Sequence, residues 1–318
     1  MREFRKSFKH WRRRAKFNRQ RLLVRLRASA ALPAARHREQ NGISRSIGFT
    51  TERLEEALAD ACRALDLVPL EQPERSHWRK SIGAKVCAPG GTHYWLKVSG
   101  AFKKEALWYR EGEETAAAVN GLPKPTLLKN HDWTTGDVAW RATLMTLAPS
   151  SPFAPAMAFG QGVGALTDEW IGDLKSAVDV IGRIDTPRFR MGPDYIADLV
   201  TCRFGRSAPH VADEWRTAHG DLNWSHLTAP VLSVLDWEMW GRAPRGLDAA
   251  CLISFSCANR DLVVRLSAAF ADDLNTPSGR VAQLAHCSEL LVLVESGWLN
   301  PKFHKPLEEI ALARLHDG

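Results

Sequence analysis

The sequence lacks the hallmarks of several protein classes. Its six cysteines form no CxxC pair and stand at no zinc-like spacing from histidines, so we expect reduced thiols instead of disulfides or a zinc site. The longest uncharged run, residues 142–167, is interrupted by prolines and glycines, which favours a connector over a membrane span. No apolar segment precedes a small-residue cleavage site, as a signal peptide would require. These absences predict a cytoplasmic protein with no transmembrane segment.

Charge is distributed unevenly along the 318 residues, whose net charge is +7. Residues 1–50 hold 15 Lys and Arg against two acidic residues and carry +13, so the remainder carries −6. A basic extension can contact nucleic acid or anionic lipid, whereas an acidic body suits a cationic or neutral substrate. Neither property identifies a substrate.

The basic extension, residues 1–48, has an amphipathic pattern over residues 1–27. The apolar residues at helical spacing are Phe4, Phe8, Trp11, Ala15, Leu22 and Leu26. The pattern is typical of a helix with weak affinity for an anionic surface such as a membrane or nucleic acid, and also of a solvated tail. The tail interpretation is preferred, because basic runs are weak motifs.

Residues 49–148 have the pattern of a small sheet with helices. Thr51 is a candidate N-cap, and apolar residues follow it at helical spacing, so a helix is expected from there. Further elements are expected as strands over 84–88 and 93–99 joined by Pro89-Gly90-Gly91, a helix over 103–119, and strands over 125–128 and 138–147.

Residues 149–318 are mostly helical in pattern, with apolar periodicity over 171–181, 262–270 and 281–294. Residues 216–248 are the exception, because they alternate short strand-like runs with polar turns. The composition, 45% hydrophobic, allows a full core in one large domain or in two lobes.

Two carboxylates stand out within residues 216–248. In His219-Gly220-Asp221 the glycine permits a sharp turn that presents the acid, and the histidine can brace the turn from behind. Fifteen residues later, Asp236 is expected at the end of an apolar strand, where it could hold a divalent cation. Two such carboxylates form a plausible pair of general base and metal ligand.

The segment HGDLNWSHLTAPVLSVLDWEMWGRAPRGLDAACL resembles the catalytic segment of the aminoglycoside phosphotransferase family. Residues 94–98 (YWLKV) resemble the family's strand with the phosphate-binding lysine, and residues 108–111 resemble the start of the helix with that lysine's carboxylate partner. Residues 122–125 (LPKP) resemble its LPVP turn, and residues 143–148 resemble the strand whose backbone contacts adenine. The segments occur in the family's order over roughly residues 52–260, which makes the resemblance specific.

The resemblance implies an α+β fold, bilobal and protein-kinase-like. Residues 49–148 would form the nucleotide-binding N-lobe, a small and mainly antiparallel sheet with one helix. Residues 149–318 would form the larger, mainly helical C-lobe with the catalytic loop and the substrate-binding helices. The implied activity is ATP-dependent transfer of the γ-phosphate to a hydroxyl of a small molecule such as an aminoglycoside, a sugar or an amino alcohol.

The resemblance also implies a role for each matched residue. Lys97 would contact the ATP phosphates and be held by Glu111. Asp221 would accept the proton of the attacking hydroxyl, and Asp236 would bind the Mg²⁺ that bridges the phosphates. Asp248 matches a family aspartate that anchors the catalytic loop.

Weaker candidates complete the nucleotide site. The backbone around Ala148 would contact adenine. Ser81 and Gly83 are candidates for a loop over the phosphates, although Ser81-Ile82-Gly83 lacks repeated glycines and a plain turn is an equal alternative.

His226 departs from the family pattern, which has asparagine there as a second metal ligand. Magnesium prefers oxygen donors, whereas Mn²⁺ accepts nitrogen more readily, so His226 predicts a weakened Mg²⁺ site. Asn223 stands nearby, where the family often has histidine, as if the two residue types were exchanged. The alternative function is therefore a catalytically weak or inactive pseudokinase that binds nucleotide or a partner.

Overall fold

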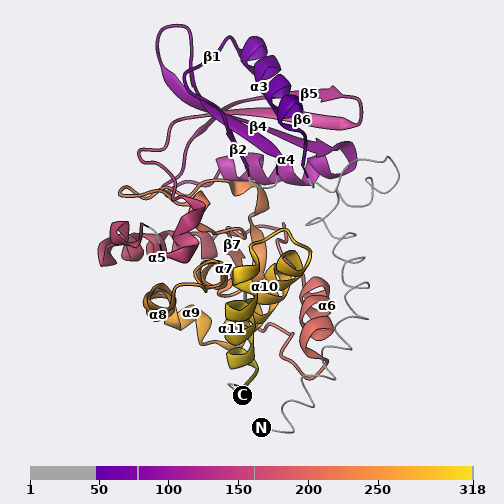
Figure 1. The fold of residues 1–318 in the computed structure, drawn as a ribbon, viewed down its shortest axis with the longest axis vertical. Helices are drawn as coiled ribbons and strands as arrows, with labels where there is room; N and C mark the ends of the chain where they lie inside the picture. The colour runs from indigo at the N-terminus through magenta and orange to yellow at the C-terminus, as the bar shows by residue number, and fades with distance from the viewer. Residues whose placement is uncertain (1–47, 77–78, 161, 317–318) are drawn as a thin grey trace. The chain divides into compact units, whose positions relative to one another are not determined.

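The computed structural model describes residues 48–76, 79–160 and 162–316 (Figure 1). The predicted extension, apart from Gly48, lies outside these residues. The chain divides into two compact units, of which one contains residues 48–120 and 124–149 and the other contains residues 121–123 and 150–316 of the described chain. We call them the sheet unit and the helical unit and describe each by itself.

The sheet unit is built on a six-stranded antiparallel sheet with the strand order β1-β3-β4-β6-β5, in which β2 also pairs with β3. The strands are β1 Val68–Pro69, β2 Glu74–Arg75, β3 Ser81–Cys87, β4 His93–Phe102, β5 Leu127–Thr135 and β6 Val138–Met145. The predicted Pro-Gly-Gly reversal joins β3 to β4, and Gly90 and Gly91 have φ of 98° and 86°, a region that glycine enters without steric cost.

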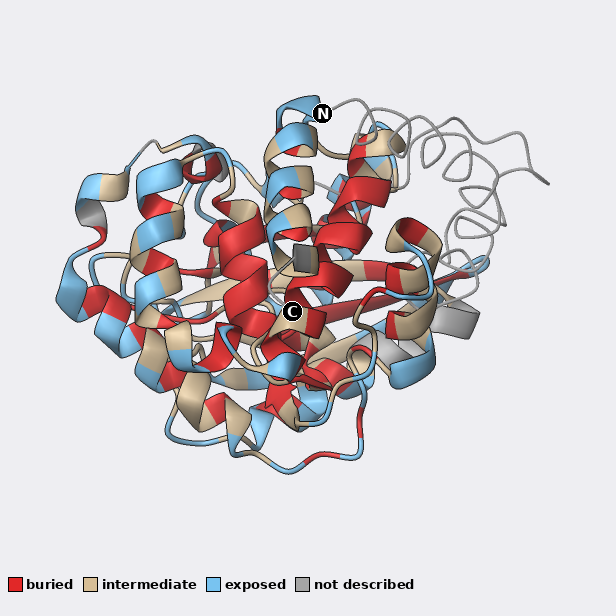
Figure 2. Cartoon of the chain, turned by 90° about the horizontal axis from the view of Figure 1, so that it is seen from below, coloured by how far each residue is buried: buried red, intermediate tan, exposed pale blue. Residues whose placement is uncertain are grey.

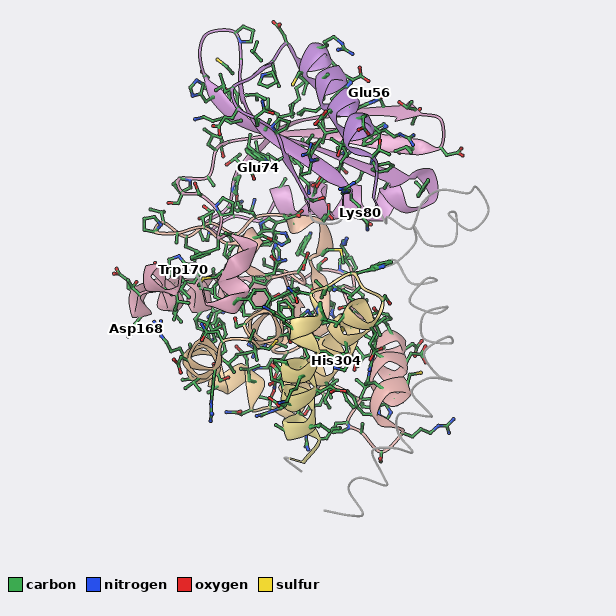
Figure 3. The ribbon with its side chains drawn as sticks, viewed as in Figure 1. Glu56, Glu74, Lys80, Asp168, Trp170 and His304 are labelled. Atoms are coloured by element: carbon green, nitrogen blue, oxygen red, sulfur yellow. The ribbon has the colours of Figure 1, made fainter. Side chains whose placement is uncertain are left out.

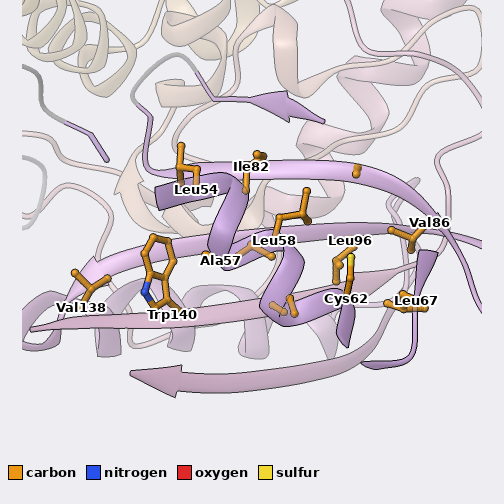
Figure 4. Close-up of a cluster of buried hydrophobic side chains, with 14 residues drawn as sticks. Leu54, Ala57, Leu58, Cys62, Leu67, Ile82, Val86, Leu96, Val138 and Trp140 are labelled. Carbon is orange, nitrogen blue, oxygen red and sulfur yellow. The ribbon is translucent and has the colours of Figure 1, made fainter. Parts of the chain in front are cut away.

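Two helices of the sheet unit use opposite faces of the sheet, because side chains alternate along a strand. Leu96 of β4 and Trp140 of β6 pack against α3, Thr51–Leu65, as Figure 4 shows, and Val98 of β4 belongs to the same cluster. The intervening residues, Lys97 and Arg141, instead bond to side chains of α4, Lys103–Ala117. The predicted helices are confirmed, although the cap of α3 is the hydroxyl of Thr50, which accepts from Arg53 N.

The helical unit contains a short hairpin of β7, Trp215–Ala218, and β8, Gly241–Pro244. Its α-helices are α5 Asp168–Gly182, α6 Pro193–Phe204, α7 Leu247–Phe255, α8 Arg260–Ala269, α9 Ala271–Leu274, α10 Pro277–Glu295 and α11 His304–His316. Short 3₁₀ turns are η2 Pro155–Phe159, η3 Val163–Ala165, η4 Trp224–His226, η5 Trp237–Met239 and η6 Pro301–Phe303.

Helix α10 lies in the core of the helical unit and is buried along most of its length. Buried residues are drawn in red in Figure 2. A helix that is apolar on nearly all sides is stable only when other elements surround it. Helix α5 begins with Thr167 as its cap, and Trp170, labelled in Figure 3, lies in its first turn. The indole of Trp170 donates to Thr228 O at 3.0 Å. None of the described helices is long and apolar enough to cross a membrane.

Two local expectations from the sequence are wrong. Ser81 and Gly83 do not form a loop, because they belong to β3 and pair with Ser99 and Lys97 of β4. The segment before Asp236 is not a regular strand: it makes only an isolated bridge between Leu227 and Val234.

Candidate active site

In the sheet unit, Lys97 is paired with a carboxylate. Its Nζ lies 2.9 Å from Oε1 of Glu113, and the two side chains are only 11% and 10% exposed. The hydroxyl of Thr143, opposite Lys97 in the neighbouring strand, donates to the second oxygen of Glu113 at 3.2 Å. The ammonium of Lys97 therefore has a fixed orientation, because the Glu113 carboxylate that it contacts is fixed by Thr143.

The carboxylate partner is therefore Glu113, and the sequence prediction of Glu111 is wrong. Both residues lie on α4, but two residues along a helix correspond to a rotation of about 200°, so they occupy opposite faces. Glu113 faces the sheet, whereas Glu111 is exposed. The position of each glutamate around the helix could have distinguished them, because the partner of Lys97 must lie on the face of α4 that points toward β4.

Helix α4 is attached to the sheet by a second set of ion pairs. Arg141, which is 5% exposed, makes a forked contact to both oxygens of Asp132 and a further contact of 2.7 Å to Glu114 of α4. The guanidinium lowers the pKa of the Asp132 carboxyl. Arg110 of α4 also donates to the carbonyl of Trp140 at 2.8 Å. These contacts fix the position of α4 and, with it, that of Glu113.

The remaining nucleotide candidates in the sheet unit have different surroundings from those expected. Gly83 lies beneath the ring of Trp95: a Cβ at Gly83 would be 2.5 Å from Cζ2 of that ring, so only glycine fits there. The strand expected to include Ala148 ends at Met145, and Ala148 lies in the following loop, half-buried.

In the helical unit, β7 leads directly into His219-Gly220-Asp221. Asp248, near the start of α7, accepts the backbone N–H of His219 at 2.8 Å and that of Gly220 at 2.9 Å. Burial raises the pKa of Asp248 to about 6, although the two N–H donors favour its charged form. The loop is thus anchored from below by Asp248, in the way expected from the sequence.

His219 is completely buried and braces the loop from a second side. Its Nε2 donates to the carbonyl of Leu235 at 2.9 Å, and its ring meets that of Trp237 edge to face at 5.0 Å. Burial lowers its pKa to about 3, so the imidazole is neutral at neutral pH. Because Leu235 precedes Asp236, His219 connects the two candidate carboxylate segments.

Asp221 itself keeps 37% of its side-chain surface exposed. The surrounding protein raises its pKa by desolvation and Asp236 raises it further, while His226, Arg190 and the amide of Asn223 lower it. The Asn223 amide donates to Asp221 Oδ1 at 3.2 Å. The carboxyl group is therefore oriented and accessible to a reactant.

His226 lies between the two aspartates. Its Nδ1 donates to the backbone carbonyl of Asp221 at 2.8 Å, and its Nε2 lies 3.4 Å from Asp236 Oδ2. In a neutral ring with the proton on Nδ1, Nε2 is the acceptor nitrogen. Two ligands of one cation at about 2.1 Å each lie about 3 Å apart when adjacent, so Nε2 and the Asp236 carboxylate fit a shared divalent cation.

The local backbone explains how these groups come together. Gly220 has φ of 82°, which favours glycine, and Asp236 has φ of 63°, a region that Asp tolerates better than most residues. Leu235 N donates to His226 O at 2.8 Å, which ties the Asp236 segment to η4. Asn223 caps η4 and accepts from Ser225, so its position is fixed as well.

Comparisons with known structures identify the fold. APH(4)-Ia, an aminoglycoside phosphotransferase, is similar with a TM-score of 0.56 at 14% sequence identity, over 84% of this chain and 99% of that one. An aminoglycoside-3'-phosphotransferase of type VIII matches with a TM-score of 0.50 at 15% identity, over 73% and 98%. The amicoumacin kinase hAmiN, crystallised with AMP-PNP and Ca²⁺, matches with a TM-score of 0.51 at 10% identity, over 82% and 96%.

These similarities confirm the predicted α+β protein-kinase-like fold and the structural resemblance to aminoglycoside phosphotransferases. No protein-family model and no curated protein sequence matches the chain. At 10–15% identity the likeness establishes the fold alone, so the activity has to be argued from the residues of the two units.

Proposed function

We propose that this chain is an ATP-dependent phosphotransferase that transfers the γ-phosphate of ATP to a hydroxyl of a small molecule, such as an aminoglycoside, a sugar or an amino alcohol. The observation that carries the proposal is Asp221, an accessible carboxyl group on a loop whose backbone is held by the buried Asp248. Neighbours of the same fold were crystallised with ADP and hygromycin B or with AMP-PNP, which supports nucleotide as the phosphate donor.

In the proposed reaction, Asp221 accepts the proton of the acceptor hydroxyl as its oxygen forms a bond to the γ-phosphorus. The bond between that phosphorus and the β–γ bridging oxygen breaks, and ADP leaves with the bond's electron pair. Little covalent chemistry is required of the protein, because phosphoryl transfer depends mainly on positioning and charge neutralisation.

Lys97 would contact the ATP phosphates, because an ammonium already oriented by Glu113 can reach phosphate oxygens without reorienting. Asp236 and His226 would hold the divalent cation, which supplies charge neutralisation at the phosphates when bound. A nitrogen donor in this pair favours Mn²⁺ over Mg²⁺. The acceptor is expected to be neutral or cationic, because the sequence beyond residue 50 carries −6.

The test is an ATP-consumption screen across aminoglycosides, macrolides, amino alcohols and simple sugars, in Mg²⁺ and in Mn²⁺. With an active acceptor, Asp221→Asn should reduce turnover by about 10²–10⁴, the usual effect of losing a general base, while ATP affinity by calorimetry stays near wild type. Asp137→Asn, at an exposed residue in the turn between β5 and β6, is the matched control. Near-normal turnover in Asp221→Asn would remove this residue from the mechanism.

A pseudokinase is the second candidate, and His226 is the observation that favours it. Its Nε2 lies 3.4 Å from Oδ2 of Asp236, and an imidazole nitrogen is a poorer ligand for Mg²⁺ than an oxygen, so a cation bound there would be held weakly. Calorimetric binding of ATP with no metal-dependent turnover, or only very slow turnover, on every acceptor would support this alternative, whereas efficient turnover in either metal would exclude it.

A further inference from the structure

A buried arginine outside the candidate active site contacts the catalytic loop from below. Arg190 lies in the segment between α5 and α6, and only 7% of its side chain is exposed. Its Nε donates to the carbonyl of Gly220 at 2.8 Å, and one Nη lies 3.1 and 3.4 Å from the two oxygens of Glu289 in α10. Tyr195 of α6 donates to the same carboxylate at 3.0 Å.

Gly220 is consequently held at both of its peptide groups. Its N–H donates to Asp248, and its carbonyl, which belongs to the peptide plane shared with Asp221, accepts from Arg190. The packing is close, because a Cβ at Gly220 would lie 2.6 Å from Cγ of Arg190. Rotation of the plane that begins Asp221 would break the bond to Arg190, so the arginine limits the directions available to Asp221.

The charges around Arg190 favour a fixed guanidinium. Asp221 faces it from the loop, Asp248 and Cys251 face it from α7, and Glu289, His286 and Tyr195 face it from α10 and α6. Burial lowers the pKa of His286 to about 4, so that ring is neutral. The charge of Arg190 lowers the pKa of Glu289 against the opposing effect of burial. Removing either partner of such a pair leaves an uncompensated buried charge, which disturbs everything it contacts.

We propose that Arg190 is a positioning residue for Asp221, acting through the carbonyl of Gly220 and held in place by Glu289 and Tyr195. We infer that Arg190 positions the loop from these contacts alone, whereas the expected effect of Arg190 on turnover rests on the proposed phosphotransferase function. The alternative is that the Arg190–Glu289 pair only joins α10 to the rest of the helical unit.

The helical unit contains a matched control for this alternative. Arg203 of α6 makes a forked ion pair with Glu295 of α10 at 2.6 and 3.0 Å, and its side chain is 5% exposed. None of the contacts described for Arg203 involves residues 219–221. Arg203→Met therefore removes the ion pair of a buried arginine to the same helix without removing a described bond to the catalytic loop.

The experiment compares Arg190→Met with Arg203→Met by hydrogen exchange, thermal melting and steady-state kinetics. Both variants should melt at lower temperature. Only Arg190→Met should increase the exchange rates of the His219 and Gly220 amides, by about tenfold or more, an increase that corresponds to about 1.4 kcal/mol. It should also reduce kcat by at least about tenfold while changing the KM for ATP less than about threefold, because the loss concerns the base and not nucleotide binding.

Glu289→Gln provides a second variant if Arg190→Met does not fold, since it keeps the side-chain volume and removes only the charge. Glu289→Gln should also increase the exchange rates of the His219 and Gly220 amides and reduce kcat, but by smaller factors than Arg190→Met. Equal amide exchange in the Arg190 and Arg203 variants, or unchanged exchange in Arg190→Met or Glu289→Gln, would overturn the proposal. An inactive wild type would refute the proposed function, and the exchange comparison would still decide whether Arg190 positions the loop.

Discussion

The buried His219 should make the stability of the protein depend on pH in a way that one substitution removes. Its pKa in the folded state is about 3, below the ordinary value of 6.5, because the ring is desolvated and neighbours His226. As pH falls below 6.5, the unfolded chain binds a proton at this residue that the folded chain does not. The free energy of unfolding therefore falls on acidification and is fully retained above about pH 6.5.

The magnitude follows from the two pKa values. Each pH unit between 6.5 and 3 costs about 1.4 kcal/mol, so going from pH 7 to pH 5 should remove about 2 kcal/mol of stability through His219. Asp248 acts in the opposite direction: with a pKa of about 6 in the folded state, it binds its proton more tightly there and gains stability as pH falls from 6 toward 3.8. Asp248 is present in both the wild type and a His219 variant, so its contribution cancels when the pH dependences of their stabilities are compared.

His219→Gln keeps a nitrogen donor at similar reach for the carbonyl of Leu235 but cannot titrate. Urea unfolding followed by tryptophan fluorescence at pH 7 and pH 5 should show a difference about 2 kcal/mol smaller in His219→Gln than in the wild type. His93→Gln, at an exposed residue at the start of β4, should reproduce the wild-type difference. If His219→Gln loses as much stability on acidification as the wild type, His219 is not held neutral in the fold.

Two further predictions concern the charged groups of the two units. Lys97→Ala and Glu113→Ala should each lower turnover with ATP. The double variant should lose less than the sum of the two losses, because each single substitution already removes the same interaction. Glu111→Ala is the control, and additive losses would indicate that Lys97 and Glu113 have independent roles. The wild type should turn over faster in Mn²⁺ than in Mg²⁺, and His226→Asn should raise the Mg²⁺-dependent rate; full wild-type activity in Mg²⁺ would contradict the assigned role of His226.

The features that could be predicted from the sequence depend on short stretches of chain. The α3 helix, the β3–β4 reversal and the turn at Gly220 follow from capping, glycine and apolar spacing within a few residues. The contact of Asp248 with the loop was also predictable, but only through a resemblance in the order and spacing of motifs. The helix and strand boundaries shifted by a few residues, as at Met145, where pairing partners decide where a strand ends.

The features that were missed depend on spatial relations. The sequence predicted Glu111 as the partner of Lys97 from its distance to the turn at residues 122–125. The partner is Glu113, because the residue that pairs with Lys97 must lie on the face of α4 that points toward the sheet. Gly83 lies in a strand because it pairs with Lys97 of β4, and the ring of Trp95 leaves no room for a side chain there; no local pattern reveals either contact. Arg190 has no signal at all in the sequence, because its partner is 99 residues away.

The two ion pairs to α10 also have a consequence for protein synthesis. Their partners are separated by 99 and 92 residues, so Arg190 and Arg203 leave the ribosome well before Glu289 and Glu295. At about 5–20 residues per second the delay is about 5–20 s. During this interval Arg190 has no carboxylate partner on α10, and the catalytic loop should remain open to proteases. Limited proteolysis of ribosome-stalled chains should cut near residue 220 when they end before α10, and protection of these shorter chains would show that the loop forms without that helix.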